Sequence, residues 1–294
     1  MTLPVFVPRR LDKFLRDSTH HTVVEVRGLL AQAVVTVGGA VCTDAERLVF
    51  EDDAVMLNER LLSPRTEHEH FAFHKPRSVT STTRDPRGKA DLSRFMASLP
   101  RGVFPVGRLD RETTGLMLFT SDGDLANAVL HPDHGTTKSY WIWLDDHVPD
   151  DDERLRTMQA GVQVGSDWLR VEGVQVEHRS EDFTELSVTL HEGKNRHLRR
   201  LCRALDFHLV GLHRRRVGPI ELGALAPGSF RPLHDDEVTA LWRTTGGRKR
   251  VLQRKVRALH RLAKQQRAPA VQQERLERWL AAHEKSEDAA SGTR

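Results

Sequence analysis

Three short apolar segments constrain most strongly what this chain can fold into. They cover residues 116–120, 139–144 and 184–190, and each has the length and the β-branched or aromatic content of a strand. The helical patterns between them, at 124–130 and 195–205, are short and do not alternate regularly with the strands. A doubly wound parallel sheet needs a helix after each strand, so this order predicts an α+β domain whose mixed, largely antiparallel sheet is flanked by helices.

The start of the chain predicts a separate small α/β module. Leu11, Phe14 and Leu15 have the i, i+3, i+4 spacing of an amphipathic helix. The other expected elements are a helix at 23–32, a strand at 34–37, a Gly-Gly turn at 38–39 and a strand at 54–57. We assign the module to residues 8–57 and the polar stretch at 58–70 to a linker.

A hinge divides the remaining residues into a second domain, 71–243, and a C-terminal tail, 244–294. The hinge is the Thr-Thr-Gly-Gly run at 244–247. Beyond it, apolar residues keep helical spacing among many cations, and residues 246–267 carry nine Lys or Arg and no acidic residue. This basic, partly helical tail either contacts phosphates or is a solvated extension.

The overall charge is a mild indication of a polyanionic partner. The chain has 294 residues, a formal net charge of +4 and a calculated isoelectric point of about 9.3. Residues 1–66 are nearly neutral, with eight Lys or Arg against nine Asp or Glu. No apolar run is long enough to cross a bilayer and the first residues are unlike a signal peptide, so we expect no membrane contact and a cytoplasmic location.

Residues that could hold a metal or a cofactor are not arranged for that purpose. Cys42 and Cys202 form no CxxC pair, which indicates free thiols in a reducing compartment and excludes a zinc site of the CxxC type. His68, His70 and His74 are close in sequence, but no HExxH motif accompanies them. The chain also has no Walker loop and no GxGxxG fingerprint, so we expect neither a metal nor a nucleotide cofactor.

Asp110 is the first candidate for chemistry. It stands between Arg108 and Arg111, directly before a Thr-Thr-Gly turn and an apolar strand. Neighbouring cations favour the ionised carboxylate at neutral pH, which is the form that a nucleophile or a base requires. The alternative is a solvated salt-bridge cluster, which is the usual role of an Arg-Asp-Arg run.

Tyr140 is the second candidate, and it is the only tyrosine in the chain. A tyrosine can stack on a base and can also transfer a proton. The alternative is a strand tyrosine with its ring in the core and its hydroxyl at the surface.

A basic helix start is the third candidate. Asn195 is a plausible N-cap, which leaves Arg196, Arg199 and Arg200 on the first turns, where residues three or four apart share a face. Like charges so close repel, so an anion should compensate them, either an RNA phosphate or a carboxylate such as Asp110. The alternative is an exposed basic helix face. The basic surface continues through residues 212–218.

Six motifs in this order resemble the RsuA-like family of bacterial ribosomal RNA pseudouridine synthases, over about residues 8–242. They are Lys75-Pro76, then Gly107–Asp110 with Thr114–Leu116 and Asp122-Gly123, then Lys138–Tyr140, then Glu192–Arg196 with Leu198–Arg200, then Leu212–Arg214, and finally Leu225–Gly228. Each motif is moderately specific, and their correct order makes the set very specific. The resemblance implies an enzyme that turns a uridine of structured RNA into pseudouridine without a cofactor.

The resemblance also implies roles for individual residues. Asp110 is the catalyst, and it either attacks the sugar or base or takes a proton from the sugar. Tyr140 stacks on the uracil, and Arg199 pairs with Asp110. The residues implied in binding the substrate RNA are Arg108, Lys138, Lys194, Asn195, Arg196, Arg200, Leu212 and Arg214.

Residues 8–57 resemble an S4-type RNA-binding module, with two departures from the family pattern in the whole chain. Thr19-His20-His21 stands where a Ser-Arg-Arg run is common, and His197 stands where a glutamine is usual.

The identity of the RNA is left open by the motifs. Ribosomal RNA is the first expectation and transfer RNA the second. A different class of answer is a non-catalytic RNA-binding factor in ribosome assembly. We expect a monomer.

Overall fold

The computed structural model describes residues 6–65, 67–83, 88–131, 133, 135–265 and 270–291, and its elements fall into two units. The residues up to His68 form one unit together with those from Gly246 onward, and Glu69–Thr245 form the other. The predicted second domain, 71–243, nearly coincides with the latter. The tail, which we predicted as a segment of its own, groups with the start of the chain. No described helix has both the length and the apolar character that crossing a membrane requires.

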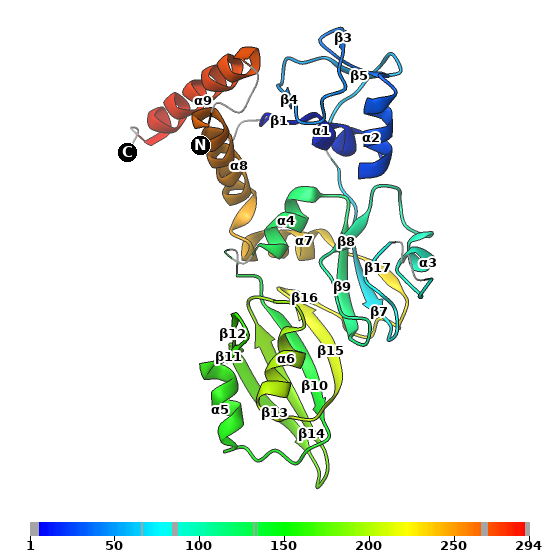
Figure 1. Ribbon diagram of the computed structural model, residues 1–294, viewed down its shortest axis with the longest axis vertical. Helices are drawn as coiled ribbons and strands as arrows, with labels where there is room; N and C mark the ends of the chain where they lie inside the picture. The colour runs from blue at the N-terminus through cyan, green and yellow to red at the C-terminus, as the bar shows by residue number, and fades with distance from the viewer. Residues whose placement is uncertain are drawn as a thin grey trace. The chain divides into compact units, whose positions relative to one another are not determined.

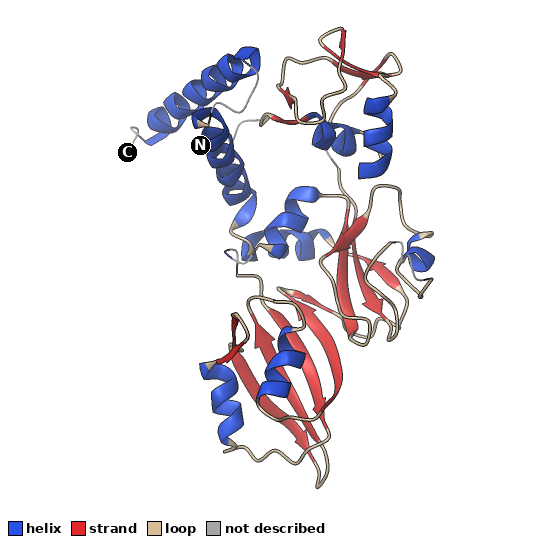
Figure 2. Ribbon diagram, viewed as in Figure 1, coloured by secondary structure: helices blue, strands red, loops and turns tan. Residues whose placement is uncertain are grey.

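The second unit is built on one mixed sheet, whose strands are red in Figure 2. Its strand order is β13-β14-β10-β15-β9-β7-β17, with the labels given in Figure 1. Its strands are β7 (His70–Lys75), β8 (Phe104–Val106), β9 (Thr114–Thr120), β10 (Lys138–Leu144), β13 (Gly173–Arg179), β14 (Thr184–Leu190), β15 (Leu209–Val217), β16 (Ile220–Glu221) and β17 (Phe230–Pro232). β8 pairs with β9, β16 pairs with β15, and β11 (Val162–Val164) and β12 (Asp167–Leu169) form a separate hairpin. Among the described strands, only the pairing of β9 with β15 is parallel. The predicted α+β class is confirmed.

The strands that the sequence predicted have one buried face, as their alternation requires. On β10, Tyr140, Ile142 and Leu144 are buried while Trp141 and Trp143 lie on the opposite, partly exposed face. The buried side chains pack with Leu198, Leu201 and Cys202 of α6 (His197–Ala204), whose ribbon crosses this sheet in Figure 1. The other helices of this unit are α3 (Ser93–Met96), α4 (Gly123–Leu130), α5 (Glu153–Ala160) and α7 (Asp235–Thr244).

The N-terminal end of α6 differs from the prediction. We expected Asn195 to cap the helix, but the N-cap is Arg196, which has a left-handed backbone with φ of 49°. No side chain caps this end, and the first turn is entered through a bond from the His197 amide to the Lys194 carbonyl of 3.0 Å. The helix therefore starts later, and Arg196 stands at its entrance instead of on its first turn.

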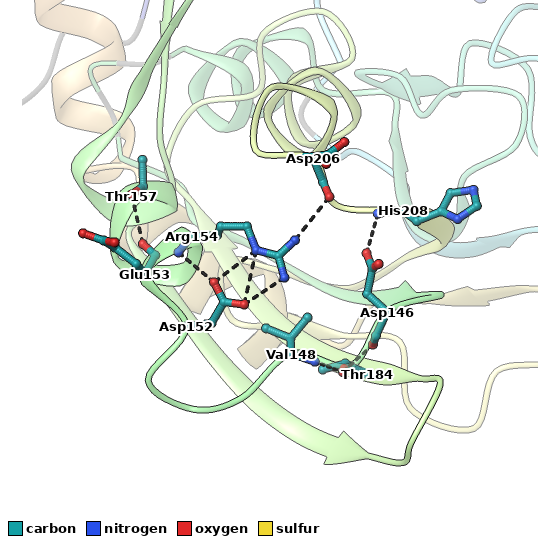
Figure 3. Close-up of polar contacts among 9 residues, drawn as sticks. All are labelled: Asp146, Val148, Asp152, Glu153, Arg154, Thr157, Thr184, Asp206 and His208. Atoms are coloured by element: carbon teal, nitrogen blue, oxygen red, sulfur yellow. Dashed lines mark hydrogen bonds and ion pairs between the residues drawn. The ribbon is translucent and has the colours of Figure 1, made fainter.

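A polar network holds the C-terminal end of α6 (Figure 3). Arg154 binds both carboxylate oxygens of Asp152, at 2.8–3.2 Å, and donates to the carbonyl of Asp206 at 3.2 Å. The Asp146 carboxylate accepts from the His208 amide at 2.6 Å. These contacts join α5 and the end of β10 to the turn after α6, so they hold the far end of the helix that carries the candidate arginines.

The parallel contact between β9 and β15 requires a glycine. Gly115 lies opposite Arg214 and has a φ of +104°, which side chains rarely tolerate. A Cβ atom at this position would overlap the Arg214 backbone, which has no freedom to move because it lies inside the sheet. The two halves of the sheet join at this pairing, so the junction requires a residue without a side chain at position 115.

Gly115→Ala is therefore expected to lower the free energy of unfolding by about 3 kcal/mol or more, through overlap and backbone strain together. Urea denaturation of the purified variant measures this loss. Gly173→Ala, in β13 of the same sheet, is the control, because its Cβ meets nothing within 4 Å and its change should stay within about 1 kcal/mol. Equal losses in the two variants would contradict the argument from close approach.

The first unit contains the predicted two helices and hairpin. The helices are α1 (Leu11–Ser18) and α2 (Val23–Ala31), and the strands are β1 (Arg9–Arg10), β2 (Val35–Val37), β3 (Ala40–Val41), β4 (Leu48–Val49), β5 (Val55–Leu57) and β6 (Arg60–Leu61). Leu11, Phe14 and Leu15 are buried, as their spacing predicted. The linker prediction of 58–70 is wrong at both ends, because Arg60–Leu61 turn back to pair with β5 and β7 already begins at His70.

The tail forms two helices, α8 (Gly247–Lys264) and α9 (Ala270–Ser291), that pack on the start of the chain (Figure 1). The predicted helical spacing after the hinge is confirmed. Gly246 and Gly247 both have positive φ, at 82° and 79°, so these glycines make the turn between α7 and α8. The shared apolar cluster contains Val7, Leu48, Phe50, Leu259, Ala263, Leu276 and Leu280.

Candidate active site

Asp110 lies in the loop between β8 and β9, which form an antiparallel pair in the sheet. The loop leaves β8 at Gly107, which has a φ of +77°, and enters β9 through a turn in which the Thr113 amide donates to the Asp110 carbonyl at 3.0 Å. The Asp110 side chain is 28% exposed. The carboxylate is thus partly buried but still open to a substrate.

Two buried side chains hold the backbone on both sides of Asp110. The Ser81 hydroxyl donates to the Leu109 carbonyl at 2.6 Å and accepts from the Leu109 amide at 3.0 Å. The Lys75 ammonium donates to the carbonyls of Arg111 and Thr113, at 3.1 and 2.8 Å, and to its neighbour Pro76 at 2.9 Å. These bonds fix the position from which the Asp110 carboxylate projects.

Lys75 is fully buried, which is rare for a lysine. Burial lowers the pKa of its ammonium to about 8, although the nearby carboxylates of Glu112 and Asp110 oppose this shift. The side chain is still mainly protonated at neutral pH, and its three donors match the three carbonyls. Its charge and geometry make it the central support of the Asp110 loop.

Arg199 and Arg196 face the carboxylate from the start of α6. Nε of Arg199 lies 3.5 Å from Oδ2 of Asp110, and Nη1 of Arg196 lies 3.7 Å from the same oxygen. Arg199 also donates to the Thr113 hydroxyl at 3.3 Å. The predicted pairing of Asp110 with the basic helix is therefore present in the geometry, and two cations converge on one carboxylate oxygen.

The environment of Arg199 is partly desolvated, with its side chain 17% exposed. Burial lowers the pKa of its guanidinium, and the negative charge of Asp110 opposes the shift, but arginine stays protonated in proteins at any ordinary pH. Its Nε has no hydrogen-bond partner among the described residues, since the ion pair is longer than a hydrogen bond. Such a contact can tighten when substrate excludes water from the site.

Arg199→Gln is expected to slow the chemical step about 10²–10³-fold. The partly buried Asp110 carboxylate then keeps only the longer contact to Arg196, and removing one partner of a buried ion pair costs about 3–5 kcal/mol. Single-turnover rates at saturating RNA measure this effect. Arg203→Gln is the matched control on the same helix, where the side chain is exposed, and its rate should stay within about twofold of the wild type. A Gln variant at position 199 with an unchanged rate would refute a role for this guanidinium.

Four other predicted binding residues make contacts within the protein. Lys138 donates to the backbone carbonyls of Thr136 and His191, and Lys194 donates to the carbonyl of Trp168. Arg200 donates to the carbonyl of Val164 and to the carboxylate of Asp167. Arg214 donates to the carbonyl of Leu116. Burial lowers the pKa of the Lys138 ammonium to about 8, and the charge of Arg214 contributes to this. These side chains brace the strands and the β11–β12 hairpin around the site.

The remaining predicted residues differ in exposure. Tyr140 and Leu212 are buried at 7% exposure each and belong to the same core cluster as Leu109, directly before Asp110. Arg108 is exposed, and so is Asn195, which precedes α6. The apolar core thus reaches the Asp110 loop at Leu109, and the exposed Arg108 precedes it in the same loop.

The comparisons with known proteins agree with this site. A family model described as RNA pseudouridylate synthase matches residues 69–204, which include Asp110, Tyr140 and Arg199. The chain is 33% identical over 238 residues to ribosomal small subunit pseudouridine synthase A of Vibrio cholerae, covering 80% of this chain and 100% of that one. The chain belongs to the RNA pseudouridine synthases. The predicted RsuA-like resemblance and enzyme class are confirmed.

Two further matches extend across most of this pseudouridine synthase. An uncharacterized RNA pseudouridine synthase of Mycobacterium bovis is 36% identical over 218 residues, covering 73% of this chain and 77% of the relative. A solved structure titled as a pseudouridylate synthase has a TM-score of 0.55 and 25% identity, covering 79% of this chain and 99% of that one. Both the sequence and the fold of the enzyme are therefore those of this family.

Sequence reasoning missed the supports of the catalytic loop. Lys75 was recognised only as part of a Lys-Pro motif, and Ser81 and Thr113 were not singled out. One feature of the sequence could have indicated that Lys75 is buried, since this residue ends an apolar strand. Among the described residues, no group of three or more His, Cys, Asp and Glu side chains is close enough to hold a metal ion.

Proposed function

We propose that this pseudouridine synthase isomerises a specific uridine in ribosomal RNA, with Asp110 as its catalytic carboxylate. The observation that carries the proposal is the convergence of Arg199 and Arg196 on one oxygen of Asp110, at 3.5 and 3.7 Å, in a loop braced by Lys75 and Ser81. The similarity to a small-subunit enzyme over its entire length favours ribosomal RNA over transfer RNA.

The target uridine must leave the RNA stack to reach Asp110. Flipping a nucleotide costs a few kcal/mol, which contacts to phosphates and bases must offset. Arg108 is exposed beside the catalytic loop, and Arg196 is 54% exposed at the entrance of α6, so both are available to the RNA backbone. We assign these two residues to holding the RNA around the flipped nucleotide.

Asp110 begins the reaction, either by attack on the sugar or base or by removing a proton from the sugar. The bond between C1′ and N1 breaks, the uracil turns, and C5 bonds to C1′ as any bond to Asp110 is released. C5 then loses its proton while N1 gains one, which restores the aromatic base. The product contains the same atoms as the uridine, so the reaction requires no cofactor. Tyr140 forms an apolar wall against the uracil, and Arg199 holds the carboxylate in position through their ion pair.

The N-terminal part of the first unit, residues 8–57, acts in this proposal as an S4-type RNA-binding module. Its two helices and the antiparallel strands β2, β3 and β5, which β6 extends just beyond residue 57, support that assignment. The enzyme works as a monomer in the cytoplasm, where ribosomal RNA is made and modified.

Chemical mapping of pseudouridines across total RNA tests the proposal, with cells that have the gene intact or deleted. Loss of one ribosomal RNA site on deletion, and its return when the gene is restored, is the expected result. Loss of a transfer RNA site instead would move the target to transfer RNA. No lost site in any RNA would support a non-catalytic role in ribosome assembly.

A further inference from the structure

Residues 1–66 contain the predicted RNA-binding module and carry little net charge. Three of the module's acidic side chains are paired internally, since Arg9 binds Asp17 at 2.8 Å and Arg10 binds Asp12 and Glu46 at 3.0 and 2.7 Å. These pairs also occupy the arginines at the start of the module. Any strong attraction of this unit for a polyanion must come from somewhere else.

The tail is attached to the module by an extensive apolar contact. Leu259 and Ala263 of α8 and Leu276 and Leu280 of α9 are all buried at 8% exposure or less, in one cluster with Val7, Leu48 and Phe50. Burial of each of the three leucine side chains is worth about 1.5–3 kcal/mol. The α8–α9 hairpin is therefore a structural part of the first unit.

Specific polar contacts determine how the hairpin docks. Gln272 of α9 accepts from the Leu48 amide at 3.1 Å and donates to the Leu48 carbonyl at 3.3 Å, which extends the edge of β4. Arg275 binds Asp52 and Asp53 at 2.6 and 2.9 Å and lies 4.3 Å from the centre of the Phe50 ring. Two acidic residues of the module are thus neutralised from α9, which packs with α8 in the same apolar cluster.

The orientation of α8 leaves a row of cations on its outer side. Leu259 and Ala263 face the core, so the helical repeat places Arg257, Arg261 and Lys264 on the opposite side. All three are exposed, and none has an ion-pair partner among the residues that the structure describes. Residues three and four apart lie about 5–6 Å from each other on a helix, so these like charges repel until an anion binds.

We propose that Arg257, Arg261 and Lys264 form a phosphate-binding row on α8, which contacts the backbone of the substrate RNA and supplies the cationic surface that the module lacks. RNA is favoured over an acidic protein because the family acts on RNA and a continuous row of cations matches a continuous row of phosphates. The inference rests on RNA as the substrate class and is independent of which RNA carries the target uridine.

A triple charge-neutral variant tests the row: Arg257→Gln, Arg261→Gln and Lys264→Gln in the full chain. The probe is a fluorescein-labelled RNA stem-loop of arbitrary sequence, with its affinity measured by anisotropy over a range of salt concentrations. Each lost phosphate contact removes about 0.7–0.9 from the slope of log K against log salt, so a decrease of about 2 is expected. The affinity at low salt should fall about tenfold or more, and thermal melting should be unchanged because the three side chains are exposed.

The control removes the same charge from other helices. It replaces three exposed arginines that have no ion-pair partner in the described structure: Arg156, Arg203 and Arg243, each to Gln. This variant should keep the salt slope within about 0.5 of the wild type, if position rather than net charge decides binding.

An unchanged slope in the α8 variant, or an equal decrease in both variants, would overturn the proposal. An unchanged slope would also leave an acidic protein as the partner of the row. The binding measurement needs no modification of the probe, so it gives its result even if no ribosomal RNA site is lost in the mapping experiment. The rate at saturating RNA should equal that of the wild type, since the row touches no reacting atom.

Discussion

Asp110→Asn is expected to abolish pseudouridine formation, with a fall in the single-turnover rate of about 10⁴-fold or more, as is found when the central group of a catalytic set is removed. Asparagine has nearly the same shape and keeps the loop bonds made by Lys75 and Ser81, because these go to backbone atoms of the neighbouring residues. What it removes is the negative charge with which, in the proposed mechanism, Asp110 attacks the substrate or takes its proton. Release of labelled hydrogen from C5 of uridine in RNA measures the rate.

Glu112→Gln is the control for this variant. Glu112 lies two residues further along the same loop and pairs with Arg77 and Arg111 at 3.0 and 2.8 Å. Arg77 lowers the pKa of Glu112 through its hydrogen bond. The Glu112 carboxylate is exposed, and its ion pairs are with Arg77 and Arg111 and not with Arg199. Its replacement should change the rate less than about threefold, as expected for an exposed ion pair. If both variants were equally slow, loss of charge in the loop would explain the effect, and Asp110 would have no special role.

The stability of the Asp110→Asn protein separates chemistry from folding. A melting temperature equal to that of the wild type, together with a lost activity, is the expected combination. An intact activity in this variant would show that the catalytic carboxylate has been assigned to the wrong residue.

The fold was predictable where one strand face is buried. The alternation in 139–144 and 184–190 places every second side chain in the core, and β10 and β14 pair in register from Lys138↔Leu190 to Leu144↔Thr184. The pairing of Asp110 with the basic helix could be inferred because like charges on one helical face need a counter-ion. Local pattern was enough for the strands, whereas for the basic helix it left an RNA phosphate as the alternative and only the family resemblance implied Asp110.

The parts that could not be predicted depend on contacts between distant residues. Arg275 reaches Asp53 across 222 positions, and nothing in the spacing of either segment indicates that contact. The predicted start of α6 was wrong because asparagine is the commoner N-cap residue. Here the N-cap is Arg196, whose backbone is in the left-handed conformation. The support of the Asp110 loop by Lys75 depends on the register of β7 against β9, in which Lys75 faces Gly115.

Lys75→Met is expected to destabilise the second unit by about 3–6 kcal/mol, which is a large part of the stability of an ordinary domain. Methionine has a similar length and fills the same apolar path, so the loss comes from the carbonyls of Pro76, Arg111 and Thr113, which lose their donor. Urea denaturation measures the stability. In the fraction that stays folded, the single-turnover rate should also fall, because the backbone on either side of Asp110 is released.

The pH dependence of the same pair of proteins tests whether the Lys75 charge itself is buried. The folded pKa is about 8 and the ordinary value is 10.5, so between these pH values the unfolded chain binds more protons than the folded one. Folding stability contributed by this group therefore rises with pH across that window, because the folded protein no longer holds a buried charge. The wild type should gain stability relative to Lys75→Met from neutral pH to about pH 9.5. A difference that stays constant with pH would mean that Lys75 keeps an ordinary pKa, and that solvent reaches its ammonium beneath the Asp110 loop.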